Sequence, residues 1–382
     1  MAKHATLSAS SSHRWLNCPP SVRICENYAD VTTDYAAEGT DAHALCEFRL
    51  KQSLGIPAEN PIENLTWYNT EMEDCAAGYA AYVMELLEDA KQACTDPVVM
   101  IEQRVDFSRW VKDGFGTADC ILIADGVLNI VDYKHGKGVE VSAEKNPQMM
   151  LYALGALEIF DGIYDIETVR MTIYQPRLSN ISIFEMSKDA LLEWANTELT
   201  QKAQLAYEGK GEFHSGEWCR FCKAKAECRE RAEANLELAK YEFAKPSLLE
   251  DEEIADILGK VDALTAWADD VKEYALQQAV GGKKWTGWKL VEGRSNRRYT
   301  NEDRVANVVT HAGFDPYERN VLGITAMQKL LGKTRFEKLL SPYIEKPQGK
   351  PTLVPESDKR PAYEPARQIE RAKSDFEGEQ NV

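Results

Sequence analysis

The stretch 114–138, GFGTADCILIADGVLNIVDYKHGKG, contains the strongest local structural signal in the chain. Two apolar runs rich in β-branched residues, 117–123 and 127–131, flank an Ala-Asp-Gly turn. An Asp-Gly pair between such runs is typical of a β-hairpin. The stretch therefore predicts two adjacent antiparallel strands, which form the centre of a sheet that the rest of the chain surrounds.

Three charged side chains lie on this hairpin. Asp119 lies on the first strand, and Asp132 ends the second. Lys134 follows Asp132 by two residues, so both side chains leave the strand on the same face. The hairpin is therefore expected to bring two carboxylates and one ammonium group together at one edge of a sheet.

This set of groups has a chemical use. Two carboxylates and a backbone carbonyl suit Mg²⁺ or Mn²⁺, which prefer oxygen ligands. Such a metal lowers the pKa of a bound water and neutralises charge on a phosphodiester. Lys134 can position that water and offset charge in the transition state. The alternative is an ordinary hairpin with an exposed aspartate and a solvated Asp–Lys pair.

Length and composition limit the class of protein. The chain has 382 residues, enough for two or three domains, and its 44% hydrophobic and 28% charged residues are typical of soluble globular proteins. The formal net charge of −17 argues against a general nucleic-acid coat but not against an enzyme with a local basic channel. Since the sequence has no apolar run of membrane length and no signal-peptide core, we expect no membrane partner and a cytoplasmic location.

The segments around the hairpin predict an α/β fold. We expect a short helix ended by Cys18-Pro19, then a second helix capped by Thr40 with His43 on its first turn. A strand at 98–105 carries Glu102, a weaker candidate for the metal shell. Periodicity predicts further helices and strands, so that helices flank a central sheet; the ranges are 71–94, 146–159 and 189–207 for helices, and 169–174 and 181–186 for strands.

Four cysteines form a pattern of their own. Cys219, Cys222 and Cys228 have the spacing C-x₂-C-x₅-C, and three thiolates this close need a cation, supplied by zinc or an iron–sulfur cluster. Cys18, followed by proline, is the best candidate for the fourth ligand. Cys25 is a weaker competitor, and the alternative is a set of unrelated cysteines. The other cysteines are expected to be small core residues; these are Cys25, Cys46, Cys75, Cys94 and Cys120.

The C-terminal third is of a different character. Residues 236–280 have helical composition and are expected to form a connector, with a capping box from Ser247 and Glu250. Residues 281–299 interleave basic residues with aromatics, which suits either a path for single-stranded nucleic acid or a solvated hairpin on a tryptophan core. The remainder of 281–346 suggests a small helical module, and residues 347–382 suggest a weakly structured tail.

The ordered motifs resemble the RecB-like branch of the PD-(D/E)XK nucleases, in the group with an iron–sulfur staple. That group includes AddB-type helicase–nuclease subunits and CRISPR adaptation exonucleases, and uncharacterised phage and prophage proteins are similar as well. The resemblance covers residues 5–230 and has Asp132 where many relatives have glutamate. The matching segments are Leu7-Ser8-Ala9-Ser10 with Trp15-Leu16-Asn17-Cys18-Pro19, Gly39-Thr40-Asp41-Ala42-His43, Gly116-Thr117-Ala118-Asp119, Val131-Asp132-Tyr133-Lys134-His135-Gly136, Gln148-Met149-Met150-Leu151-Tyr152 and the three-cysteine loop.

The resemblance implies a role for each matching residue. It implies a restriction-endonuclease-like core over residues 1–235, a mixed sheet flanked by helices with a cluster-binding knuckle and a helical C-terminal extension. Cys18, Cys219, Cys222 and Cys228 would hold a [4Fe–4S] cluster rather than zinc. The expected roles in the site are catalysis for Asp119, Asp132 and Lys134; binding of Mg²⁺ or Mn²⁺ for His43, Asp119, Asp132 and the Tyr133 carbonyl; and DNA contact for Gln148 and Tyr152.

The implied activity is that of a metal-dependent deoxyribonuclease, an exonuclease rather than an endonuclease. It would serve phage recombination or replication in the bacterial cytoplasm, with DNA and a phage recombination or annealing protein as partners. The alternative is a catalytically silent DNA-binding or scaffold protein that keeps the nuclease fold. The full set of His43, Asp119, Asp132 and Lys134 favours the enzyme.

Overall fold

The computed structural model describes residues 5–30, 33–124, 126–237, 249–292, 299–317 and 321–345. The chain divides into two compact units, residues 1–283 and 284–382, and each is described by itself. Among the described residues, no helix combines the length and the apolar character that a membrane crossing requires.

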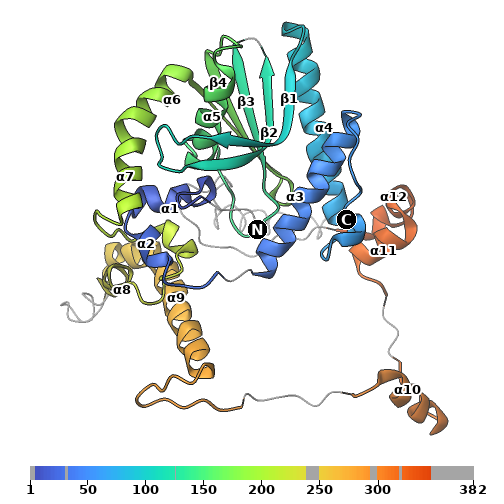
Figure 1. Cartoon of the computed structure of the whole chain (residues 1–382). Helices are drawn as coiled ribbons and strands as arrows, with labels where there is room; N and C mark the ends of the chain where they lie inside the picture. The colour runs from blue at the N-terminus through green and yellow to red at the C-terminus, as the bar shows by residue number, and fades with distance from the viewer. Residues whose placement is uncertain are drawn as a thin grey trace, which may run out of the picture. The chain divides into compact units, whose positions relative to one another are not determined.

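A single five-stranded sheet forms the centre of the first unit (Figure 1). Its strands lie side by side in sequence order, and only β3 and β4 pair in parallel, so the sheet is mixed. The parallel pair requires a crossover, which the helix α5 provides. The strands are β1 (Val98–Asp106), β2 (Phe115–Ala124), β3 (Val127–Tyr133), β4 (Thr168–Gln175) and β5 (Asn180–Ser187).

The predicted hairpin is present as β2 and β3. Val127 pairs with Ala124, and Gly126 adopts a φ of +75°, a conformation that glycine tolerates without steric cost. Asp125, the remaining residue of the predicted turn, lies outside the described residues. β2 and β3 are buried along most of their length, because helices cover both faces of the sheet.

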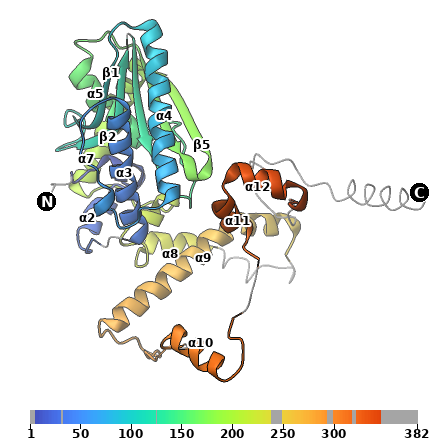
Figure 2. The ribbon, with the colours of Figure 1, turned by 90° about the vertical axis from the view of Figure 1, so that its right-hand side faces the viewer.

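Two layers of helices enclose the sheet (Figures 1 and 2). On one face, α3 (Asp34–Ser53) and α4 (Thr70–Ala93) pack over Cys120, Val131 and Tyr133. On the other face, the apolar helix α5 (Pro147–Phe160) packs with α1 (Ser12–Asn17), α6 (Lys188–Trp194) and α7 (Thr200–Glu208). The mixed α/β architecture with helices on both faces is confirmed.

The helix that carries His43 starts earlier than the sequence predicted. Thr33, not Thr40, caps α3, since its hydroxyl accepts a hydrogen bond from the Ala36 amide. The Thr40 hydroxyl instead donates to the Ala36 carbonyl inside the helix. His43 therefore lies in the middle of α3 and not on its first turn. The prediction was wrong because Gly39-Thr40 resembles a helix start, yet Gly39 is accommodated within the helix.

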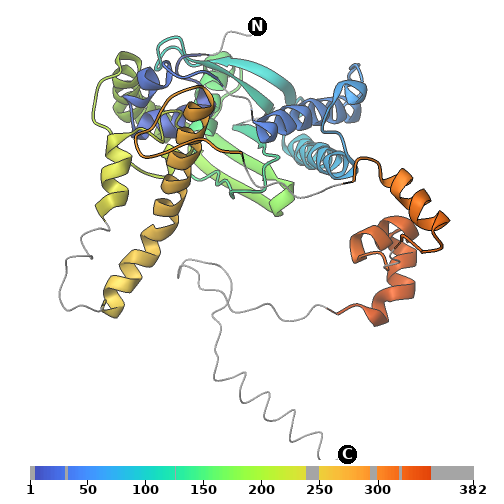
Figure 3. The same ribbon diagram turned by 90° about the horizontal axis from the view of Figure 1, so that it is seen from below.

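A helical pair follows the cysteine loop (Figure 3). The helix α8 (Arg229–Leu236) contacts α9 (Asp251–Val280), and Asp270 of α9 binds Arg231 and Lys225 at 2.6 Å each. A capping box does start α9, but it consists of Glu250 and Glu253. Ser247, its expected partner, lies outside the described residues.

The described part of the second unit is helical. Its helices are α10 (Glu302–His311), α11 (Ile324–Leu331) and α12 (Lys333–Leu340). Residues 284–292 form no strand and Trp288 is exposed, so these residues do not form the expected hairpin on a tryptophan core. The rest of the basic segment, 293–298, and the expected tail from residue 347 lie outside the described residues.

Candidate metal centre and cysteine pocket

The charged groups of the hairpin lie together where β3 ends. Asp119 Oδ2 accepts a hydrogen bond from the Tyr133 amide at 2.7 Å, which fixes this carboxylate beside the last residues of β3. Asp132 is buried, and its Oδ2 lies 2.8 Å from Lys134 Nζ. Tyr133 is the last residue of β3, so its carbonyl belongs to the same strand end.

Two further residues join this group from neighbouring elements. His43 Nδ1, from α3, lies 3.3 Å from Asp119 Oδ2, and the His43 ring packs edge-on against Tyr133. Glu102 approaches from β1: His43, Glu102 and Asp119 each offer a ligand atom, and these atoms lie within 4.8 Å of one another. We call the set of His43, Glu102, Asp119, Asp132 and Lys134 the acidic site.

Glu102 has an unusual backbone. Its φ is +50°, although it lies within β1. The ladder with β2 pairs Ile101 with Cys120 and Gln103 with Ala118, but the pairing is interrupted between them, where Glu102 faces Asp119. Positive φ in a residue other than glycine costs free energy and is concentrated at functional sites. No local sequence pattern predicts this backbone conformation, which explains why Glu102 was only a weaker candidate for the metal shell.

The electrostatics of the acidic site indicate excess negative charge. Burial, with the nearby Asp119 carboxylate, raises the pKa of Glu102 to about 7. Burial also raises the pKa of Asp132, and the Lys134 ammonium only partly opposes this effect. Burial alone would raise the pKa of Asp119, but His43 and Lys134 keep it below its usual value. A bound divalent cation would offset the burial and the mutual repulsion that disfavour the charged forms of Glu102 and Asp132, so the donor set fits such an ion.

Lys134 and His43 are charged when protonated, so burial acts on their pKa values in the opposite direction. Burial would lower the pKa of Lys134, but the Asp132 and Asp119 carboxylates outweigh burial and raise it. Burial would likewise lower the pKa of His43, and Asp119 raises it above the usual value. Lys134 is therefore a charged donor at neutral pH, while at His43 the raised pKa means that protonation competes more strongly with metal binding than at a free imidazole.

Gln148 and Tyr152 lie on the inner side of the acidic site. The Gln148 amide donates to Asp132 Oδ1 and to the Tyr152 hydroxyl, at 3.1 Å each, and its carbonyl oxygen accepts from Lys134 Nζ at 3.2 Å. Tyr152 is 6% exposed. Contact of these two side chains with DNA stays a prediction, and for Gln148 it would compete with three hydrogen bonds inside the protein.

A buried polar network behind the site was missed in the sequence. The Tyr133 hydroxyl shares a hydrogen bond of 2.7 Å with His135 Nδ1, and His135 Nε2 lies 3.5 Å from Glu38 Oε1. Arg177 binds the same Glu38 oxygen at 3.0 Å. Because Glu38 and His43 are both on α3, the network fixes this helix against the ends of β3 and β4. Only the histidine after Lys134 could have suggested it.

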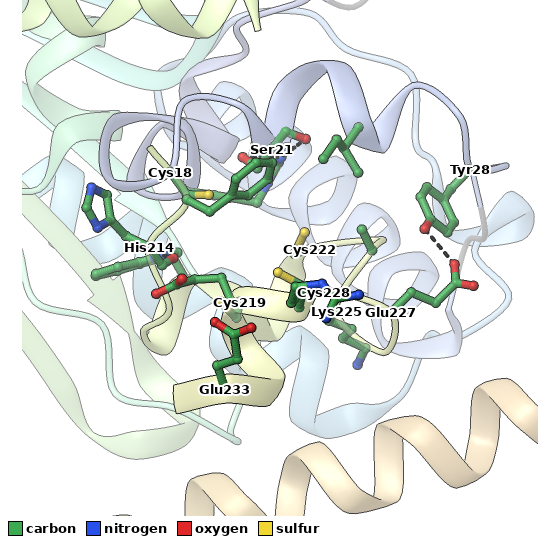
Figure 4. A pocket seen from close by; sticks show the side chains of 17 residues that line it. Cys18, Ser21, Tyr28, His214, Cys219, Cys222, Lys225, Glu227, Cys228 and Glu233 are labelled. Carbon is green, nitrogen blue, oxygen red and sulfur yellow. Dashed lines mark hydrogen bonds between the residues drawn. The ribbon is translucent and has the colours of Figure 1, made fainter. Parts of the chain in front are cut away.

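The four predicted cluster ligands line one pocket of about 480 Å³ (Figure 4). Cys18 directly follows α1, and Cys219, Cys222 and Cys228 lie on the loop before α8. Burial raises the pKa of the Cys18 thiol, and negative charge on Cys219 and Cys228 would raise it further, because the three groups are close. All four thiols are free. Unbridged thiols that converge on one cavity fit a thiolate-ligated metal centre.

Cys25 lies beside this pocket rather than in its lining. Its Sγ is 3.8 Å from Cys222 Sγ, and Arg14 donates a hydrogen bond to it at 3.3 Å. The hydrogen bond with Cys222 lowers the pKa of Cys25 to about 5 and raises that of Cys222. The remaining cysteines (Cys46, Cys75, Cys94 and Cys120) are buried and away from the pocket lining.

Comparison with known proteins identifies a family. The solved structure titled "Crystal structure of SSO0001" is similar at 14% sequence identity, with 50% of this chain and 98% of that chain covered and a TM-score of 0.21. At that TM-score the likeness indicates neither the fold nor the activity of this chain. The profile described as "Protein of unknown function (DUF2800)" matches residues 4–361. The chain therefore belongs to the DUF2800 family of proteins of unknown function.

Proposed function

We propose that this protein is a metal-dependent deoxyribonuclease of the PD-(D/E)XK type, which removes nucleotides from DNA ends. The observation that carries the proposal is the pairing of Lys134 Nζ with Asp132 at 2.8 Å beside the converging His43, Glu102 and Asp119. Carboxylates and a histidine that hold a divalent cation next to a charged lysine suit hydrolysis of a phosphodiester. A role in phage recombination or replication, with DNA and a recombination or annealing protein as partners, belongs to the same proposal.

The acidic site assigns a task to each group. His43, Asp119, Asp132 and the Tyr133 carbonyl would hold Mg²⁺ or Mn²⁺, and the position of Glu102 supports its inclusion. The bound ion would supply Lewis acidity toward the phosphate and lower the pKa of a water. Lys134 orients the attacking water and offsets negative charge on the phosphate oxygens. The water oxygen bonds to phosphorus, and the bond from phosphorus to the leaving sugar oxygen breaks.

Gln148 and Tyr152 support this arrangement. Gln148 forms hydrogen bonds with both Asp132 and Lys134, so it fixes the position of the metal ligand relative to the water-positioning group. Tyr152 in turn fixes the Gln148 amide. We infer that Gln148 acts first on the catalytic pair, and that its contact with DNA is secondary.

The cysteine pocket is proposed to hold a [4Fe–4S] cluster with a structural role. Cys18, Cys219, Cys222 and Cys228 supply four thiolates, a set that suits both a cubane cluster and zinc. The motif resemblance favours iron. The cluster would connect the segment after α1 to the loop before α8, about 200 residues later in the chain.

Digestion of end-labelled linear DNA tests the activity. Anaerobically purified protein is incubated with Mg²⁺ or Mn²⁺ and with single- or double-stranded DNA labelled at either end, and circular DNA serves as the substrate without ends. We expect progressive shortening of linear DNA, no cleavage with EDTA, and no cleavage by Asp132→Asn. The exposed Asp189→Asn is the matched control and should cleave normally. Binding of DNA without cleavage under every condition would favour the silent DNA-binding alternative.

A further inference from the structure

The tip of the cysteine loop carries an exposed aromatic residue. Phe221 is 77% exposed, and the Arg220 guanidinium lies 5.9 Å from the centre of its ring. The neighbouring Cys219 and Cys222 line the pocket, so the metal centre proposed above would hold both ends of this two-residue tip. A single exposed apolar side chain is common on protein surfaces and needs a second observation before it suggests a function.

The second observation is the position of Arg220. A Cβ atom on Gly138 would lie 3.8 Å from Arg220 Nη2, so the guanidinium lies against the exposed loop 136–140. The Gln175 amide holds that loop by donating to the carbonyls of Gly136 and Val139, at 2.8 Å each. The loop directly follows Lys134. The tip of the cysteine loop and the acidic site are therefore neighbours, although they are far apart in the sequence.

Chain geometry limits the distance between them. The four residues from Lys134 to Gly138 span at most about 14 Å. At about 3.4 Å per stacked nucleotide, this distance corresponds to about four nucleotides of one strand. A strand whose phosphodiester bond lies at Lys134 can therefore reach the loop that Arg220 contacts within a few nucleotides.

Two exposed cations lie at this position, although the molecule as a whole is acidic. The chain has a net charge of −17, but Lys137 and Arg220 are exposed cations at the loop and the tip. Within the described part of the chain, neither side chain forms an ion pair, so both are available to phosphates. An aromatic face beside unpaired cations is the combination that binds single-stranded nucleic acid.

We propose that Phe221, Arg220 and Lys137 form a single-strand DNA contact beside the acidic site. Phe221 stacks on a base, and Arg220 and Lys137 bind the adjacent phosphates. The contact holds the strand a few nucleotides from the bond to be cleaved, and it gives the cysteine loop a role in substrate binding in addition to its structural one. This proposal rests on the proposed function in its choice of DNA as the ligand.

Fluorescence anisotropy with a labelled 20-nucleotide oligothymidylate tests the contact. Full-length protein is titrated in EDTA, which prevents cleavage, and a blunt duplex of equal length is measured in parallel. We expect Phe221→Ala to weaken single-strand binding about tenfold, as for the loss of one base stack, and Phe221→Trp to restore it. Phe314→Ala is the matched control, because Phe314 is 71% exposed in the other unit. Iron content and melting temperature should be those of wild type in all three variants.

The outcomes separate this proposal from the proposed function. Wild-type affinity in Phe221→Ala, with DNA cleavage intact, would overturn the contact and leave the nuclease standing. Weakened binding in Phe221→Ala, in a protein that never cleaves DNA, would support the contact and overturn the nuclease. An equal loss of single-strand affinity in Phe221→Ala and Phe314→Ala would indicate a nonspecific effect on folding rather than a specific contact, and would also overturn the proposal.

Discussion

The acidic site and the cysteine pocket are assembled in different ways. In the acidic site, protein groups already compensate one another: Lys134 pairs with Asp132, and His43 pairs with Asp119. In the pocket, four thiols converge without any disulfide between them. Polar contacts at the surface, such as that from Tyr28 to Glu227, also connect the N-terminal segment to the cysteine loop. If each region binds its proposed metal, loss of the metal should therefore remove chemistry from the first region and stability from the second.

The largest effect short of complete loss of cleavage is expected for Lys134→Met, which tests whether the acidic site carries the chemistry. The substitution keeps the length of the side chain and removes the charge that positions the water, so cleavage should fall about 10³-fold. Binding of Mn²⁺, measured by titration calorimetry, should persist because the carboxylates remain. Lys272→Met, on an exposed face of α9, is the control, and its cleavage should stay within a few-fold of wild type. Undiminished cleavage by Lys134→Met would contradict the assigned role.

The next effect concerns the pocket and the identity of its fourth ligand. Cys18→Ser should lose the cluster, because a ligand is removed, and a crosslink across a loop of about 200 residues contributes about 4–5 kcal/mol to stability. Cys25→Ser should keep about four irons per chain, since Cys25 does not line the pocket. Iron analysis and urea unfolding under anaerobic conditions measure both. Retention of iron in Cys18→Ser and its loss in Cys25→Ser would make Cys25, not Cys18, the fourth ligand. Stoichiometric zinc without iron in the wild-type protein would refute the cluster.

A smaller effect, on stability, is expected from Glu102→Gln. In metal-free protein the pKa of Glu102 is raised to about 7, so the folded state binds more protons than the unfolded state below that pH. Stability should therefore fall as pH rises from about 4.5 to about 7, and Glu102→Gln should regain roughly 1–2 kcal/mol at pH 8, a value reduced for partial exposure.

Urea unfolding at pH 5 and pH 8 in EDTA measures this difference, and the exposed Glu144→Gln is the control. Mg²⁺ should stabilise wild type more than Glu102→Gln. A wild-type pH dependence that persists in Glu102→Gln would remove Glu102 from the acidic site.

The smallest effect is expected for Gln148→Ala. The substitution removes hydrogen bonds to Asp132 and Lys134, so kcat should fall about tenfold while the Kd for DNA stays within twofold. Single-turnover cleavage and anisotropy separate the two quantities, and Gln204→Ala, on an exposed face of α7, is the control. A loss of affinity with unchanged kcat would instead support the direct DNA contact that the sequence suggested.

The difference between the two regions also explains what could be predicted from sequence. The hairpin was predictable because its turn and its apolar runs are local, and Asp119, Asp132 and Lys134 follow from it. The further strand segments and the flanking helices followed from periodicity, whereas the order of the strands in the sheet comes from the structure. The predicted start of α3 was wrong, because Gly39-Thr40 imitates a helix start, while the observed cap, Thr33, lies seven residues before the predicted cap.

Features that depend on tertiary contacts were not predictable. The positive φ of Glu102 occurs where the ladder with β2 is interrupted opposite Asp119, and the contact of His135 with Glu38 joins two elements far apart in the sequence. The spacing of Cys219, Cys222 and Cys228 suggested a metal centre, but only the fold shows Cys25 beside Cys222 and Arg220 beside Gly138.

A paired measurement on Asp132→Asn and Cys219→Ser tests the central claim most directly. Cleavage of end-labelled linear DNA with Mg²⁺ and the melting temperature are recorded for both variants and for wild type. The account predicts that Asp132→Asn abolishes cleavage with little change in melting temperature, since the amide preserves the shape of the buried side chain beside Lys134. Cys219→Ser should lower the melting temperature and reduce cleavage only in proportion to the folded protein that remains. Cleavage by Asp132→Asn at the wild-type rate would contradict the account.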